Sequence, residues 1–186
     1  PLVVVESNSM QHDSSGEVGT IDAGDLVLVH SPDQNKIITF AEATYPNSEN
    51  FGYESLGMEG DVIIYERNGE SDSTPIIHRA LFKINTEQTT QMNEEGKCPE
   101  GVPWNEICVI TWTVPGTKQV DVESLNLVFD GDGVGAYSCG GIAAQHGSEW
   151  FGVENYTPPN PGYITLGDNN DCNDDQGVFE FAKGLS

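Results

Sequence analysis

Two polar residues suited to serine hydrolase chemistry stand beside short apolar runs. Ser9 lies in Ser7-Asn8-Ser9-Met10, directly after the apolar run at residues 2–5. His78 ends the run Pro75-Ile76-Ile77-His78. A serine hydroxyl becomes a nucleophile when a base removes its proton, and a neutral imidazole can do this near pH 7. Taken singly, a serine in a turn and a histidine on a strand are common structural residues. The residues around them must therefore show whether they are catalytic.

The most polar loop of the chain, residues 167–177, offers the carboxylate that such a site also needs. Its acidic residues are Asp168, Asp171, Asp174 and Asp175. In a serine-protease triad one carboxylate holds Nδ1–H of the histidine, so only one of the four fills that role at a time. The loop is not an EF-hand, because Asn173 and Phe179 stand where that motif needs glycine and glutamate.

The elements that would position these residues are predicted to be strands. Short apolar runs rich in β-branched residues lie between turn residues, at 2–5, 26–29, 62–65, 76–84, 109–114 and 125–129. Gly24-Asp25 and Gly60-Asp61 each form a turn signal directly before such a run. No pattern indicates a helix longer than about two turns. We therefore predict a mainly β protein.

Composition excludes one class of function and suggests an environment. The chain has 186 residues, 37% of them hydrophobic, which fits a globular protein. Asp and Glu number 30 against 7 Lys and Arg, giving a formal net charge of −23. Such a surface repels phosphate backbones, so nucleic-acid binding is not expected. Because the acidic residues are spread over the whole chain, they indicate either an ordinary solvated acidic surface or adaptation to high salt.

The four cysteines indicate an oxidising compartment. They stand at positions 98, 108, 139 and 172, without the spacing of a zinc site. Two disulfides are plausible and three connectivities are possible. We favour Cys98–Cys108 with Cys139–Cys172, because the first pair closes a short loop that contains proline and glycine.

No run of about 18 apolar residues is present that would span a bilayer. The chain opens on Pro1-Leu2-Val3-Val4-Val5, without Met or a signal peptide. We expect this start to mark the place where a hydrophobic anchor ends.

Read in order, these segments resemble the conserved boxes of type I signal peptidases. The first box corresponds to Ser7-Asn8-Ser9-Met10-Gln11-His12, followed by the strand segment at 24–29. The next runs from Gly60-Asp61 to Pro75-Ile76-Ile77-His78-Arg79, and the last is residues 162–170 with Asp174 beyond it. His78 stands where bacterial enzymes carry a lysine base, so the archaeal and endoplasmic-reticulum branch is the more similar one.

The resemblance implies a fold and a domain organisation. It covers residues 1 to about 84 and about 160 to 181. We expect a coiled, mainly antiparallel β barrel of the signal-peptidase type, formed by residues 1–84 and 162–186. The 85–161 segment would be an inserted β-rich subdomain, which ends at the proline-rich stretch before Gly162.

The resemblance also implies an activity, the removal of signal peptides from secreted precursors after small side chains. Ser9 would attack, His78 would be the general base, Asp174 would orient His78, and Asp168 would shape the loop. The backbone N–H of Ser9 and the hydroxyl of Ser7 would stabilise the oxyanion. No metal or organic cofactor is implied. The partners would be signal peptides and a membrane, with the catalytic domain on the extracytoplasmic face of the cell membrane. We expect its shallow substrate pockets to be lined from residues 2–5 and 80–84.

The chain departs from the family pattern at three positions, where Asn8, His12 and Leu166 replace the usual glycine, proline and lysine. Two alternatives stay open. A self-cleaving or regulatory serine protease of the same fold would usually need a lysine base, and no lysine lies near either box. An acidic extracellular β domain could instead bind calcium or a protein without catalysis, for which Asp130-Gly131-Asp132-Gly133 offers a loose calcium loop.

Overall fold

The computed structural model describes residues 2–12, 19–31, 37–66, 74–88, 110–128, 152–158, 161–169 and 180–182. Strands dominate this part of the chain, as the apolar runs predict, and the protein is mainly β. Its only described helix, α1 (Phe40–Thr44), is little more than one turn long. No described helix has the length and apolarity needed to cross a membrane.

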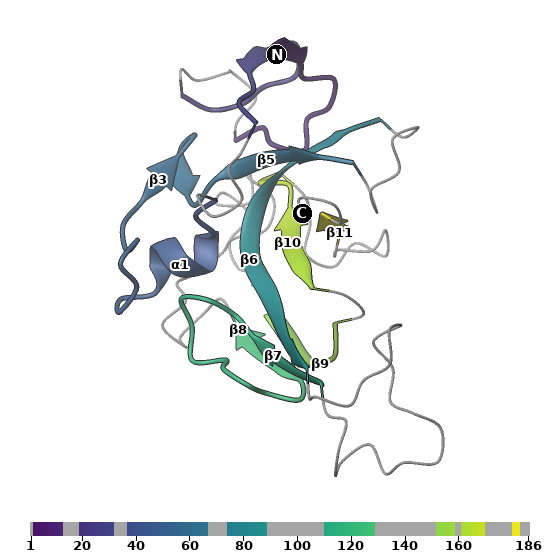
Figure 1. The fold of residues 1–186 in the computed structure, drawn as a ribbon. Helices are drawn as coiled ribbons and strands as arrows, with labels where there is room; N and C mark the ends of the chain where they lie inside the picture. The colour runs from purple at the N-terminus through teal and green to yellow at the C-terminus, as the bar shows by residue number, and fades with distance from the viewer. Residues whose placement is uncertain are drawn as a thin grey trace.

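The central sheet is organised around one long strand. This strand, β6 (Ile76–Gln88), pairs with β5 (Val62–Tyr65) on one side and with β10 (Gly162–Leu166) on the other, and all of these pairs are antiparallel. At its far end β6 also pairs with β7 (Ile110–Thr113), and β11 (Glu180–Ala182) extends the sheet beyond β10. Figure 1 shows β6 curving through the whole molecule with β10 beside it.

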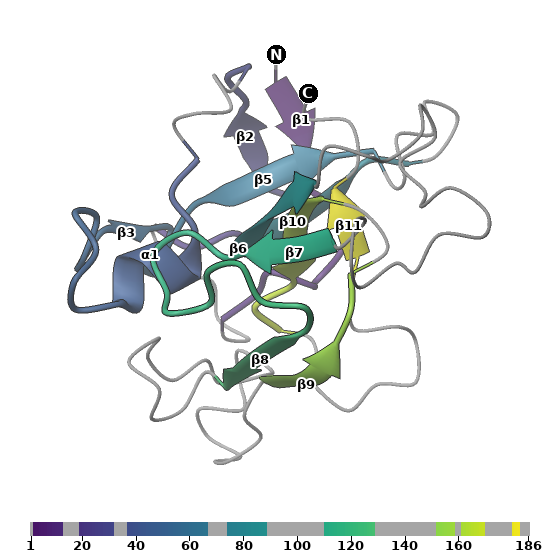
Figure 2. The same ribbon diagram turned by 60° about the horizontal axis from the view of Figure 1, so that its bottom comes forward.

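Three two-stranded ribbons surround this sheet. At the N-terminus β1 (Leu2–Val4) pairs with β2 (Leu26–Leu28), and β3 (Glu54–Ser55) pairs with β4 (Met58–Glu59) next to α1. The third ribbon joins β8 (Leu125–Val128) to β9 (Gly152–Tyr156), and it comes forward in Figure 2. Within the described strands the sheets do not close into a barrel.

The Gly60-Asp61 turn shows why that sequence precedes β5. Gly60 has φ +81°, and a Cβ at this position would lie 2.5 Å from the backbone nitrogen of Phe40, so only glycine fits. Asp61 then accepts a hydrogen bond from the backbone N–H of Ile38 at 2.8 Å and another from the Tyr53 hydroxyl at 2.8 Å. The turn therefore fixes the start of β5 to the segment that leads into α1.

The largest buried cluster brings together described segments between Phe40 and Leu166 that are far apart in the sequence. It contains Phe40 and Leu81 together with Trp112, Leu125 and Ile164. A second cluster lies between β5, β6 and β10, and a third packs the Ser9 region against the sheet. The first cluster thus includes side chains from both sides of the boundaries predicted near 84 and 162, and the division into a catalytic domain and an insertion stays a prediction.

Several sequence-based expectations fall on undescribed parts of the chain. All four cysteines lie outside the described residues, and so does the loose calcium loop at 130–133. Asp171, Asp174 and Asp175 also lie outside them. The disulfide pairing and the orienting acid therefore stay predictions.

Candidate active site

Ser9 lies in a tight turn directly after the first strand. The backbone N–H of Gln11 donates to the carbonyl of Asn8 at 3.1 Å, which closes the turn. Met10 is buried and anchors the turn in the apolar cluster below it, whereas Ser9 stays partly exposed. The hydroxyls of Ser7 and Ser9 are hydrogen-bonded at 3.1 Å. The Ser9 turn, residues 7–12, therefore presents two hydroxyl groups side by side at the surface.

A loop from the other end of the sequence holds this Ser9 turn. The backbone N–H of Asn169 donates to the carbonyl of Ser9 at 2.8 Å, and its side-chain amide donates to the carbonyl of Asn8 at 3.0 Å. These two hydrogen bonds from Asn169 form a clamp on the Ser9 turn. Asn169 follows β10 by three residues, so the sheet positions the clamp. The structure thus brings together the first and the last of the predicted boxes.

Asp168 forms the buried centre of the same region. It is 2% exposed, and its carboxylate accepts hydrogen bonds from Arg79 Nε at 2.9 Å and from Arg79 Nη2 at 2.7 Å. His12 Nε2 lies 2.8 Å from the same carboxylate. Because His12 belongs to the Ser9 turn, Asp168 ties that turn to β6 as well as to its own loop.

Burial alone would raise the pKa of Asp168, because it disfavours the charged form. The hydrogen bonds from His12 and Arg79, together with the charge of the Arg79 guanidinium, outweigh burial and lower the pKa of Asp168 below its ordinary value. Asp168 is therefore an ionised, fully engaged carboxylate at neutral pH. Such a group organises structure and is poorly suited to take up a proton.

Arg79 extends the network to the β3–β4 ribbon. Its guanidinium is fully buried and donates to the carbonyl of Gly60 at 2.6 Å and to that of Ser55 at 3.0 Å, with Leu56, Met58 and Glu59 adding further carbonyl acceptors. The planar fork of donors suits a carboxylate on one side and a curved row of carbonyls on the other. Arg79 thus joins three segments that are far apart in the sequence.

His78 lies one residue before Arg79 on β6 and is 7% exposed. Its Nδ1 lies 3.4 Å from the hydroxyl of Tyr65, and the two rings meet edge to face with their centroids 6.3 Å apart. The Tyr65 hydroxyl lies 2.6 Å from Thr165 Oγ1. The imidazole thus contacts a hydroxyl from β5 that in turn contacts β10. It is on the sheet face opposite Arg79 because strand side chains alternate.

The backbones that carry Ser9 and His78 converge. Met10 follows Ser9, Ile77 precedes His78, and both side chains belong to one apolar cluster. The side chains themselves have different described partners, since Ser9 Oγ is bonded to Ser7 and the His78 ring contacts Tyr65. The shared cluster therefore brings the two backbones together and does not by itself join the two functional groups.

The burial pattern corrects one expectation about the substrate pockets. Ala80, Leu81, Phe82 and Ile84 are each 0% exposed and form core, so they do not line a shallow surface pocket. The β1–β2 ribbon differs. Its cross-strand pairs Leu2–Leu28 and Val4–Leu26 are all more than half exposed, so Leu2 and Val4 still qualify, whereas Val5 is 3% exposed and does not.

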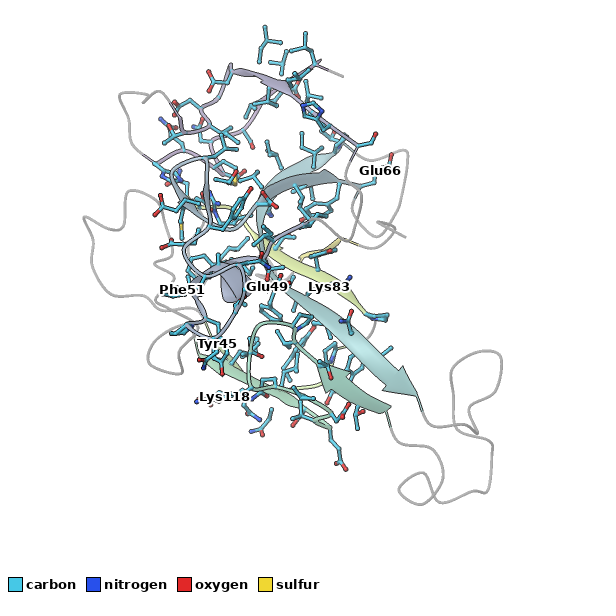
Figure 3. All side chains as sticks on the ribbon, turned by 60° about the vertical axis from the view of Figure 1, so that its left-hand side comes forward. Tyr45, Glu49, Phe51, Glu66, Lys83 and Lys118 are labelled. Atoms are coloured by element: carbon cyan, nitrogen blue, oxygen red, sulfur yellow. The ribbon has the colours of Figure 1, made fainter. Side chains whose placement is uncertain are left out.

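The described lysines do not offer an alternative base. Lys83 lies five residues beyond His78 on β6, with its Nζ 5.6 Å from the centre of the Tyr163 ring. Lys118 lies in the loop after β7. Figure 3 shows both of them away from the N-terminal ribbon, which is at the top of that view. Among the residues that the structure describes, no three His, Cys, Asp or Glu side chains gather into a potential metal site.

Two features of the site are not apparent from the sequence. His12 pairs with Asp168, although the sequence marks it only as a departure from the family pattern, and Arg79 connects Asp168 to the β3–β4 ribbon. Comparison of the chain with protein-family models, with curated proteins and with solved structures finds no match.

Proposed function

We propose that this protein is a membrane-associated serine endopeptidase of the signal-peptidase type, which removes signal peptides from secretory precursors. The observation that carries the proposal is the clamp from Asn169 onto the carbonyls of Asn8 and Ser9. It joins two segments, 160 residues apart in the sequence, that the resemblance assigns to the first and last boxes of one active site. The fold would then be the coiled barrel of that family.

In this proposal Ser9 Oγ attacks the scissile carbonyl while His78 takes up its proton and later delivers it to the leaving amine. The oxyanion is stabilised by the backbone N–H of Ser9 and by the hydroxyl of Ser7, which lies 3.1 Å from Ser9 Oγ. Asp168 holds the Ser9 turn in place through His12 and Arg79. The orienting acid on His78 is Asp174.

The test is cleavage of a secretory precursor by the purified protein in detergent, with the new N-terminus read by mass spectrometry. Ser9→Ala should remove nearly all cleavage, and Ser7→Ala should lower the rate by roughly 10²–10³, the usual effect of losing one oxyanion donor. Ser31→Ala is the matched control, because Ser31 is exposed and outside the site. Cleavage by Ser9→Ala at the rate of the Ser31→Ala control would refute the proposal.

The histidine assignment needs its own comparison, because His12 also lies close to Ser9 in sequence. His78→Gln should abolish cleavage, whereas His12→Gln should keep part of it, since glutamine can still donate to Asp168. His30→Gln, which changes an exposed histidine, should behave like the parent. Loss of cleavage in His12→Gln together with full activity in His78→Gln would reassign the base to His12.

A further inference from the structure

The second buried cluster includes and borders a row of polar groups made up of the proposed base, His78, and two residues that the proposed function leaves without a role. Tyr65 on β5, His78 on β6 and Thr165 on β10 are 4%, 7% and 0% exposed. These strands are neighbours in the order β10, β6, β5, as Figure 1 shows. Buried polar groups need hydrogen-bond partners, so three of them on adjacent strands in or beside an apolar cluster indicate a specific role.

The register places all three side chains on one face of the sheet. His78 is paired with Ile63, so Tyr65, which is paired with Ile76, lies diagonal to it. Thr165 is paired with Ala80 and is therefore diagonal to His78 on the other side. Diagonal neighbours on one face are within reach of a long aromatic side chain. The tyrosine hydroxyl thereby reaches from β5 past the histidine ring to β10.

The Tyr65 hydroxyl makes two polar contacts of different length. The Tyr65–Thr165 contact is short, at 2.6 Å, and the Tyr65–His78 Nδ1 contact is longer, at 3.4 Å. Either hydroxyl can donate in the first contact, and the more acidic phenolic O–H favours Tyr65 as the donor to Thr165 Oγ1. The phenolic oxygen then has lone pairs left to accept a hydrogen bond from Nδ1–H of His78. That arrangement selects the tautomer in which Nε2 carries no proton.

We propose that Tyr65, held by Thr165, is a positioning residue that fixes His78 in the tautomer with a basic Nε2. This inference rests on the proposed role of His78 as the general base. A histidine can accept the serine proton only through an unprotonated ring nitrogen, and a base held in the wrong tautomer is inactive. The same Nδ1–H is the group that Asp174 holds in the proposed function, so Tyr65 would share that role with Asp174.

The test combines a direct view of the imidazole with kinetics. ¹⁵N NMR of the labelled protein distinguishes the protonated from the unprotonated ring nitrogen of His78, independently of activity. We expect Nδ1 to be the protonated nitrogen in the parent protein. In Tyr65→Phe and in Thr165→Val we expect a substantial fraction of the other tautomer, kcat lowered at least about tenfold and KM unchanged, since general-base catalysis contributes roughly 10²–10⁴ in rate.

Two control variants separate positioning from packing. Tyr163→Phe removes a hydroxyl from another buried tyrosine of the same cluster and should leave both the tautomer and kcat unchanged. Thr165→Ser keeps the acceptor oxygen and should retain the parent rate, unlike Thr165→Val. The pH midpoint of the acid limb, where kcat falls as the pH is lowered, should shift in Tyr65→Phe but not in Tyr163→Phe.

The outcomes distinguish this inference from the proposed function. An unprotonated Nδ1 in the parent protein, or the same tautomer in the parent and in both Tyr65→Phe and Thr165→Val, would overturn the positioning role. A protein that shows the expected tautomer change but cleaves no precursor would uphold the contact with His78 and overturn the peptidase proposal instead.

Discussion

Replacing Asp168 by asparagine tests the buried network most sharply, because the two side chains have nearly the same shape. Asp168→Asn removes the negative charge that faces Arg79, whose guanidinium is 0% exposed. It also places an amide where the guanidinium donates at 2.7 and 2.9 Å. Removing one partner of a buried ion pair typically costs about 3–5 kcal/mol, since the other charge remains buried.

The carbonyl acceptors of the β3–β4 ribbon still bind Arg79 in the variant, which favours the lower end of that range. A loss of about 3 kcal/mol lowers Tm by roughly 6–12 °C in a domain of this size, at about 2–4 °C per kcal/mol. Thermal unfolding followed by circular dichroism measures the shift. Asp121→Asn is the control, because Asp121 is exposed and has φ 51°, a conformation that asparagine also adopts readily.

The stabilisation that Asp168 gives to the fold should decrease as the pH falls. The pKa of Asp168 is lower in the folded than in the unfolded protein, so its stabilisation is fully present above the unfolded value, near 3.8. It is lost as the pH falls from there through the folded pKa. The stability difference between the parent and Asp168→Asn should therefore be large at pH 5 and shrink below about pH 4. Equal melting of Asp168→Asn and Asp121→Asn at pH 7 would refute this account of the network.

Three further predictions concern other parts of the fold. Gly60→Ala should destabilise the protein by about 1–3 kcal/mol more than Gly52→Ala in urea unfolding, because both glycines have φ near +81° but only Gly60 meets the backbone of Phe40. Thr39→Ala should cost about 1 kcal/mol in the same assay, since it removes the capping box that Thr39 forms with Glu42, and an unchanged midpoint would contradict this. Raising salt from 0.1 to 1 M should increase Tm, because the Debye length falls from about 10 to about 3 Å and screens the net charge of −23, and a salt-independent Tm would argue against self-repulsion.

The strands were predictable because their signals are local. The apolar runs at 62–65 and 76–84 became β5 and most of β6, and the Gly60-Asp61 signal before β5 is a real turn. β6 runs on to Gln88, beyond its apolar run, because its end pairs with β7. That pairing depends on a partner strand more than 20 residues away, which a local pattern cannot reveal.

The side-chain network was less predictable, because its partners are distant in the sequence. The hydrogen bond between His12 and Asp168 spans 156 positions, and those between Arg79 and Asp168 span 89. The available signal for the Tyr65 contact was weak. Tyr65 and Thr165 are polar positions on otherwise apolar strands, and only the sheet register shows that they face the same histidine.

The clamp on the Ser9 turn also bears on the order of events during folding. Its partner, Asn169, lies 161 positions beyond Asn8, and contacts with so large a sequence separation form only after extensive loop closure. The turn therefore acquires its final geometry only when β10 has docked beside β6. Until then the Ser9 turn is present in the chain without its clamp, so the geometry on which the proposed function depends would form only when the fold is nearly complete.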